Sequence, residues 1–370
     1  MVMDVMAAAA RIEAAGGHVI HMEVGQPAAA APKVAILAAH AALDGARIDY
    51  TSALGIPSLR ERISRHYRES YGLAVDAGRI VVTTGSSGAF ILGFLAMFEP
   101  GDPVAVTVPG YPPYRHILTA LGCEPVLIET SSETRHALTG EALLAAHRKA
   151  PLKGVLVGSP ANPTGTMMSR EALTSLISAA ESAGIRFISD EIYHGLDYAF
   201  PAVTAAELSP HALVINSFSK YFCMTGWRVG WMVVPDALVR PIERLQQNLA
   251  ISVPTLSQIA AEAAFEGREE MEQIKRSYLE NRRILIEGLP RAGLTKFLPA
   301  DGAFYLYADV SDFTSDSFKF AGEMLEHAHV AATPGVDFDP VHGHRFIRFS
   351  YARSADEMRE AVTRITRWLG

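Results

Sequence analysis

Short apolar runs, rich in valine and isoleucine, alternate with helix-periodic stretches through the middle of the chain. The apolar runs lie at residues 80–82, 104–106, 126–128, 155–157, 186–188, 213–215 and 229–234. Helical patterns lie between them at 87–98, 114–121, 139–149 and 169–183. Continuous apolar runs that alternate with helices are typical of parallel strands buried on both faces. We therefore expect an α/β fold whose large domain has a mostly parallel seven-stranded sheet covered by helices.

The pattern changes after a long polar helix predicted at 268–288. Strands are then predicted at 304–309, 330–333 and 346–350, with helices at 315–328 and 354–368. Near the other end, the pattern predicts helices at 4–16, 33–44 and 57–67 and a strand at 19–24. Two more helices are expected at 236–249 and 255–266. We predict a large domain of residues 26–278 and a smaller α+β domain built from both chain ends, 1–25 and 279–370.

Composition narrows the function classes without choosing one. The chain has 370 residues, 49% of them hydrophobic and 20% charged, which is typical of an ordinary globular protein. Its formal charge is -7 and it has no basic run of five residues, so we expect no nucleic-acid partner. Two cysteines, Cys123 and Cys223, cannot build a disulfide framework or a zinc knuckle. We therefore expect a reducing compartment and no metal site.

No segment of the sequence has the pattern of a membrane anchor or a secretion signal. The N-terminal residues include Asp4 before an alanine run and lack the basic stretch of a signal peptide. The longest uninterrupted apolar run, 88–98, is too short to span a bilayer. These features predict a cytoplasmic protein without a membrane partner.

A lysine stands at the end of a predicted buried strand, in Ser217-Phe218-Ser219-Lys220. An aromatic turn follows, and Arg228 lies eight residues beyond the lysine. An apolar strand and bulky rings beside an amine lower its pKa, which makes the amine a usable nucleophile or base. A lone lysine is nevertheless more often an exposed surface residue.

Four of the five preceding strands also end in a polar cluster. The clusters are Thr83-Thr84-Gly85-Ser86-Ser87-Gly88, Pro109-Gly110-Tyr111, Ser159-Pro160-Ala161-Asn162-Pro163-Thr164-Gly165 and Asp190-Glu191-Ile192-Tyr193. The first is typical of a phosphate site at a helix N-terminus, and Tyr111 is suited to stack on a flat ligand. The buried carboxylate of Asp190 requires a cationic partner. Each cluster taken singly also has an ordinary structural interpretation. In chain order, these are a helix cap, core packing, a structural turn and a second helix cap.

Taken in order, the clusters resemble fold-type I pyridoxal-phosphate enzymes of the class I/II aminotransferase family, which includes aspartate aminotransferases. The resemblance extends from Gly25 to Arg348. Its most specific motifs are Asn162-Pro163-Thr164-Gly165, Asp190-x-x-Tyr193 and Ser217-x-Ser219-Lys220, followed by Arg228.

The resemblance implies a role for each of these residues. Lys220 would form the Schiff base with pyridoxal 5'-phosphate, Asp190 would keep the ring nitrogen protonated, and these two with Tyr193 would be the catalytic residues. Asn162 and Tyr193 would hydrogen-bond the phenolic oxygen, and Tyr111 would stack on the ring. The phosphate ligands would be Ser86, Ser87, Ser217, Arg228 and, from the partner subunit of a homodimer with shared sites, the residue equivalent to Tyr50. The substrate carboxylate would be bound by Gly25, Asn162 and Arg348.

The implied reaction moves an amino group from an L-amino acid to a 2-oxo acid through a pyridoxamine phosphate form. A β-lyase on the same scaffold would use the same cofactor residues. The Ser-x-x-Lys pattern also matches acyl-serine hydrolases, although their Ser-Asp-Asn and Lys-Thr-Gly tripeptides are absent from the sequence. The amino donor stays open, and the side chains that we considered for its pocket are His21, Met22, Val24, His194, Phe304 and Tyr305.

Overall fold

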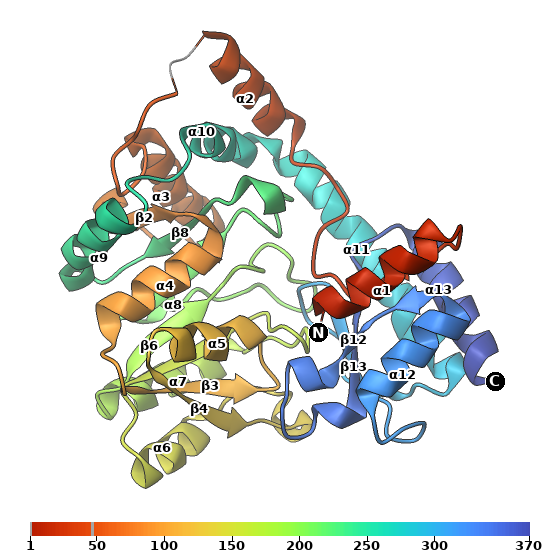
Figure 1. Cartoon of the computed structure of the whole chain (residues 1–370). Helices are drawn as coiled ribbons and strands as arrows, with labels where there is room; N and C mark the ends of the chain where they lie inside the picture. Colours follow the sequence, from red (N-terminus) through yellow and green to blue (C-terminus); the bar gives the residue numbers. More distant parts are fainter. Residues whose placement is uncertain (1, 46–47) are drawn as a thin grey trace.

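The computed structural model describes residues 2–45 and 48–370, and a seven-stranded sheet organises the larger part of them (Figure 1). The strand order is β2-β8-β7-β6-β5-β3-β4. Their bounds are β2 Ile80–Thr83, β3 Pro103–Val108, β4 Glu124–Glu129, β5 Gly154–Gly158, β6 Arg186–Asp190, β7 Leu213–Ser217 and β8 Gly230–Val233. Only β8 runs antiparallel to its neighbours. The predicted α/β fold class and all seven predicted strands of the sheet are confirmed.

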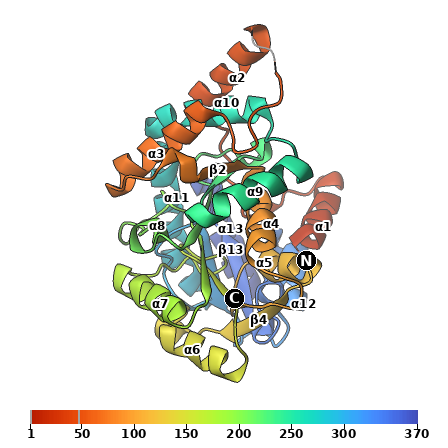
Figure 2. The ribbon, with the colours of Figure 1, turned by 90° about the vertical axis from the view of Figure 1, so that its left-hand side faces the viewer.

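Helices cover both faces of this sheet (Figure 2). One face packs against α4 (Gly85–Met97), α5 (Pro112–Ala120) and α9 (Asp236–Leu249). The opposite face packs against α3 (Pro57–Tyr71), α6 (Gly140–Lys149), α7 (Arg170–Ser182), α8 (Ala205–Leu208) and α10 (Thr255–Ala264). Alternate strand residues supply the two cores, since Val81 packs on the first face while Ile80 and Val82 pack on the second.

A second, four-stranded antiparallel sheet has its own hydrophobic core. Its order is β12 (Thr333–Pro334), β13 (Phe346–Ser350), β10 (Tyr305–Asp309) and β9 (Lys296–Phe297). The helices α11 (Arg268–Gly288), α12 (Ser317–Glu323) and α13 (Ala355–Leu369) pack around it. Both chain ends meet here, because β1 (Ile20–His21) pairs in parallel with β11 (Val330–Ala331). Helix α11 runs continuously through residue 278, and the predicted domain boundary at that position stays a prediction.

The remaining helices α1 (Val2–Ala14) and α2 (Lys33–Gly45) agree with the predicted helices at 4–16 and 33–44. The strand predicted at 19–24 was too long. Pairing with β11 ends with the hydrogen bond from Met22 N–H to the Ala331 carbonyl oxygen, and the Met22 carbonyl oxygen instead accepts from Ser350 N–H. The strand predicted at 330–333 is two strands, since Ala332 carries the chain from one sheet to the other.

Two helix predictions differ from the structure at one end. Helix α3 continues to Tyr71, where Gly72 adopts a left-handed conformation with φ of 67° and closes the helix. The helix predicted at 315–328 is α-helical only to Glu323 and continues as a π-helix over Met324–Ala328. None of the helices in the described ranges is long and apolar enough to cross a membrane.

Candidate active site

A cavity of about 690 Å³ lies where both sheets and the N-terminal segment meet. The carboxyl ends of parallel strands form one edge of a sheet, which is where α/β folds place ligands. Nine of the predicted site residues line this cavity: Gly25, Ser86, Ser87, Tyr111, Asn162, Tyr193, Lys220, Arg228 and Arg348. Residues from near both ends of the chain, such as Gly25 and Arg348, therefore lie in one site.

Lys220 projects into the cavity from the turn after β7. Its Nζ donates a hydrogen bond to the Gly25 carbonyl oxygen at 2.6 Å and lies 5.8 Å from the centre of the Tyr193 ring. Burial, with the neighbouring cations Arg348 and Arg228, lowers the pKa of Lys220 to about 8, while Asp190 opposes this shift. A neutral amine is therefore well populated near physiological pH, as nucleophilic or general-base chemistry requires.

Asp190 ends β6 directly beside the cavity and is 3% exposed. Its carboxylate accepts hydrogen bonds from the Tyr114 hydroxyl and from Ile192 N–H. Burial raises the pKa of Asp190 to about 6, although these hydrogen bonds favour the charged form. No cationic side chain in the described ranges forms an ion pair with Asp190, so its predicted cationic partner is not a protein residue there. The helix-cap alternative is wrong, because residues 192–195 form a turn without a helix.

Arg348 enters from the opposite side, on β13, and is 3% exposed. Its Nη1 donates to Asn162 Oδ1 at 2.9 Å, and Nη2 donates to the Glu23 carbonyl oxygen. The guanidinium carbon lies 4.5 Å from the Tyr305 ring centre and 4.6 Å from that of Phe338. All these partners are neutral, and the buried Nε has no partner in the described part of the chain. A buried cation without a counter-ion is ready to bind an anion.

A third cation, Arg228, lies against the N-terminus of α4. Gly85 makes this approach possible, since a Cβ at that position would stand 2.4 Å from Arg228 Nη2. Gly85 has a φ of 65° and Arg228 a φ of 51°, so both adopt the left-handed conformation. Thr84 precedes the helix without making a side-chain cap, which contradicts the predicted simple cap. Free N–H groups, the helix dipole and a guanidinium together favour a phosphate.

Two tyrosines shape the wall between these cations. Tyr111 precedes α5, and its ring meets that of Tyr114 edge-on at 5.3 Å, which leaves it in contact with both the core and the cavity. The Tyr193 hydroxyl lies 2.8 Å from the Tyr305 hydroxyl. Burial raises the pKa of both Tyr111 and Tyr193, so these hydroxyls stay protonated at neutral pH.

Two predicted residues stand apart from the cavity of their own chain. Ser217 is buried behind it and donates to Ser219 Oγ at 2.9 Å, while Ser219 itself lines the cavity. No hydrogen bond joins Ser217 to Lys220 in the described ranges, which removes the geometric basis for an acyl-serine mechanism. Tyr50 is 79% exposed and lies outside the cavity.

Sequence reasoning missed Tyr114 and Phe338, which contact Asp190 and Arg348 respectively. Tyr114 follows Tyr111 by three residues, a helical spacing that carries a weak signal, whereas Phe338 has no sequence signal. Of the side chains considered for the substrate pocket, Val24 and Tyr305 line the cavity. His21, Met22, His194 and Phe304 do not line it.

Comparison with known proteins agrees with this geometry. Residues 17–365 match the family model described as aminotransferase class I and II. The chain is 47% identical to a valine–pyruvate aminotransferase of Mycobacterium tuberculosis over 100% of this chain and 95% of that protein. A crystal structure of an aminotransferase from the same organism superposes with a TM-score of 0.97, at 47% identity, over 100% of this chain and 96% of the other.

A more distant solved structure is the aspartate aminotransferase of Thermus thermophilus with maleate. It is 31% identical, has a TM-score of 0.92, and is matched over 99% of this chain and 96% of its own. The predicted amino-group transfer activity is thereby confirmed, in a family that is generally dependent on pyridoxal phosphate. The chain belongs to the class I and II aminotransferase family.

Proposed function

We propose that the cavity holds pyridoxal phosphate, with the phosphate at Arg228 and the N-terminus of α4 and the ring nitrogen at Asp190. The fit of the residues supports this assignment. Asp190 is a buried carboxylate without a cationic partner among the described side chains, and Gly85 leaves a space that a Cβ would fill. Ser86 and Ser87 extend the phosphate corner. Bound there, the cofactor supplies an electron sink for the bond broken at the substrate Cα.

The protein residues then bind, orient and move protons. Lys220 would hold the cofactor through its Nζ, and the free amine would take the proton from the substrate Cα. Asp190 holds the proton on the ring nitrogen, and Tyr193 with Asn162 donates hydrogen bonds to the ring oxygen. The buried amine Lys220, with its lowered pKa in one cavity with Arg348, is the observation that carries this proposal.

Arg348 binds the α-carboxylate of the substrate, which orients the Cα–H bond toward Lys220. The other two cationic side chains that line the cavity, Lys220 and Arg228, are committed to the cofactor, so this chain offers a side-chain carboxylate no further lysine or arginine within the described lining. Asp337 at the cavity wall would repel such a carboxylate. We therefore propose an amino donor with an apolar side chain, and the similarity to a valine–pyruvate aminotransferase supports the same class.

A homodimer with shared sites completes the proposal. Exposed apolar side chains occur on α2, on the segment before α3 and at the end of α9: Leu37, Leu43, Ile48, Tyr50, Leu249 and Ile251. Helix α2 itself lies at the top of Figure 1. Thr51 N–H donates to Ser252 Oγ at 3.3 Å, which holds the Tyr50 loop beside the segment after α9. Exposed apolar side chains suit a second copy of the chain, and we expect sedimentation to give twice the 40.0 kDa chain mass. The cytoplasmic location stays a prediction.

The test is a half-reaction of the holoenzyme with a single amino acid and no acceptor. We expect L-valine to convert the visible cofactor absorbance completely and to release one 2-oxo acid per subunit. L-aspartate should react at least about tenfold more slowly, because the described lining of this chain offers its side-chain carboxylate no further lysine or arginine. A β-lyase would instead keep turning over and release ammonia. Faster reaction of L-aspartate would contradict the donor class, and failure of every amino acid would contradict the assigned site.

A further inference from the structure

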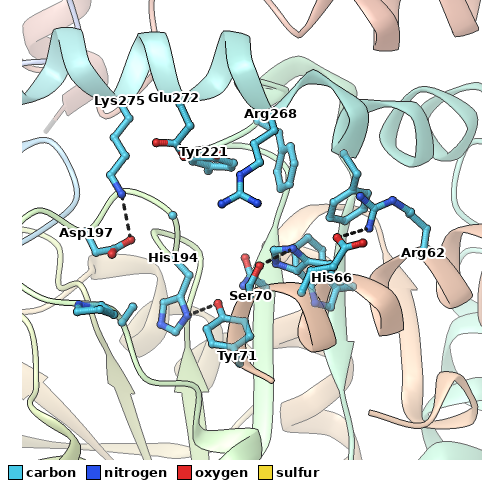
Figure 3. Close-up of a pocket in the computed structure, with 18 residues that line it drawn as sticks. Arg62, His66, Ser70, Tyr71, His194, Asp197, Tyr221, Arg268, Glu272 and Lys275 are labelled. Carbon is cyan, nitrogen blue, oxygen red and sulfur yellow. Dashed lines mark hydrogen bonds and ion pairs between the residues drawn. The ribbon is translucent and has the colours of Figure 1, made fainter. Parts of the chain in front are cut away.

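A second cavity, of about 270 Å³, lies between the helices α3 and α11, and we name it the α3–α11 cavity (Figure 3). Helix α3 contributes Arg62, His66 and Tyr71 to it, and α11 contributes Arg268 and Lys275. Its volume is near the lower end of the range for ligand pockets, roughly 300–1,000 Å³, so it suits a small molecule. It shares no lining residue with the catalytic cavity within the described ranges.

The two cavities lie on opposite sides of the same chain segments. Lys220 and Tyr193 line the catalytic cavity, while their sequence neighbours Tyr221 and His194 line the α3–α11 cavity. His194 Nε2 also lies 3.0 Å from the carbonyl oxygen of Ser159, in the turn that carries Asn162. The α3–α11 cavity is therefore adjacent to the catalytic machinery without being part of it.

Most charged side chains of the α3–α11 cavity already have partners. Arg62 donates to Glu69 at 3.2 Å and to Glu266 at 3.1 Å. Lys275 lies 3.5 Å from Asp197, as the dashed line in Figure 3 marks. These pairs hold the walls in place and leave little charge for a ligand.

Three polar groups facing the cavity have donor atoms without a partner in the described part of the chain. The Arg268 guanidinium makes neither a hydrogen bond nor an ion pair there, and Figure 3 shows it projecting from α11 toward His66 and Ser70. Asn216 is 4% exposed; its Oδ1 accepts from Ser217 N–H at 2.7 Å, while Nδ2 donates to no described group. The His66 ring meets only Ser70 Oγ, 3.2 Å from Nδ1, which leaves Nε2 free.

Unpartnered hydrogen-bond donors and one unpaired cation favour a ligand that carries hydrogen-bond acceptors and a negative charge. Burial lowers the pKa of His66 to about 4, and the nearby cations Arg62 and Arg268 contribute, so the imidazole stays neutral. The carboxylates of the lining are already engaged, Glu69 by Arg62, Asp197 by Lys275 and Glu272 by the Tyr221 hydroxyl. The rings of Trp231 and Phe265 supply an apolar wall. We propose that the α3–α11 cavity binds a small carboxylate with a short apolar tail, the carboxylate on Arg268 and Asn216 and the tail on these rings.

The experiment is calorimetric titration of the holoenzyme with isovalerate, an acid that has neither an amino nor a 2-oxo group. The titration uses an Arg348→Gln background, which removes the substrate-binding cation of the catalytic cavity. We expect one isovalerate to bind per subunit. Adding Arg268→Gln should weaken binding about tenfold or more, because a charge-assisted pair is lost. Arg268 is exposed and unpartnered within the described ranges, so its replacement breaks no contact of the fold.

Arg276→Gln is the matched control, since Arg276 lies two turns further along α11 and lines neither cavity. It should leave binding unchanged. Titration with 2-oxoisovalerate tests whether the ligand carries a 2-oxo group. Arg268-dependent binding of either acid supports the site, and tighter binding of 2-oxoisovalerate than of isovalerate would show that the 2-oxo group is recognised. Absence of binding for both acids, or equal weakening by Arg268→Gln and Arg276→Gln, overturns the proposal. The half-reaction of the wild-type enzyme with L-valine tests the catalytic assignment separately.

Discussion

The catalytic cavity and the α3–α11 cavity differ in whether their cationic side chains are paired with carboxylates. In the catalytic cavity, Lys220 and Arg348 are held by a backbone carbonyl, an amide and aromatic rings, with no carboxylate paired to either in the described ranges. In the α3–α11 cavity, Arg62 and Lys275 are paired with carboxylates and only Arg268 is left free there. A buried cation that the fold leaves without a counter-ion indicates ligand binding, whereas a paired one indicates structure.

The largest effect is expected from Lys220→Ala. It removes both the anchoring amine and the proton carrier, so amino-group transfer should fall by at least about 10⁴-fold. The measurement is turnover with an amino acid and pyruvate, alongside circular dichroism to show that the fold is retained. Retained transfer would mean that the amine with the lowered pKa is not the reacting group.

Arg348→Gln should act on binding instead. It should raise the KM for the amino donor about 10²-fold, because the substrate carboxylate loses its buried cation, while the cofactor absorbance stays in place. Arg345→Gln is the matched control, since Arg345 lies three residues earlier, is exposed and is paired with Asp309 at 2.8 Å. A similar KM for both variants would contradict the assignment of Arg348.

The reactivity of Lys220 should depend on pH in a way that exposed lysines do not share. Only the neutral amine reacts, and the pKa of Lys220 is lowered to about 8. Acetylation of the cofactor-free enzyme at this residue should therefore fall about tenfold for each pH unit below 8. Arg348→Gln should raise this pKa and move the profile to higher pH, since the Arg348 cation lowers it. Labelling read by mass spectrometry tests this, and a midpoint near 10.5 would contradict it.

The smallest catalytic effect is expected from Arg62→Gln, because Arg62 is an ion-paired residue of the α3–α11 cavity. It breaks the contacts with Glu69 and Glu266 and the stacking on Phe265, 4.4 Å from the guanidinium carbon. Urea unfolding should show a loss of about 1–3 kcal/mol in the free energy of unfolding. The KM should stay unchanged. A raised KM with unchanged stability would show that this pair serves catalysis instead.

The seven central strands were predictable because burial on both faces leaves a continuous apolar run in the sequence. Of the two-residue strands, β9 was missed, while β1, β11 and β12 were predicted only as parts of longer runs, since their pairing depends on where the chain crosses between sheets. Catalytic-cavity residues such as Lys220 and Asn162 were predictable because each follows a strand, and strand ends converge at one edge.

The contacts around those residues were not predictable in the same way. Tyr114 reaches Asp190 only because α5 packs on β3 and β4, which brings its hydroxyl to the end of β6, and Phe338 reaches Arg348 from a turn after β12. The α3–α11 cavity draws on five segments, within 62–71, 194–202, 216–222, 231 and 265–275, and no spacing in the sequence links them. Such contacts are products of tertiary packing and leave no local pattern.

The N-terminal segment has a consequence for how the protein is made. Residues 20 and 21 pair with residues 330 and 331, and the Glu23 carbonyl oxygen accepts hydrogen bonds from Thr333 and Arg348. On the ribosome, these early residues emerge more than three hundred positions ahead of their partners. The nascent chain can assemble its seven-stranded sheet before the segment around Gly25 has the C-terminal residues that it packs against. The complete active site therefore forms only in the final stage of synthesis.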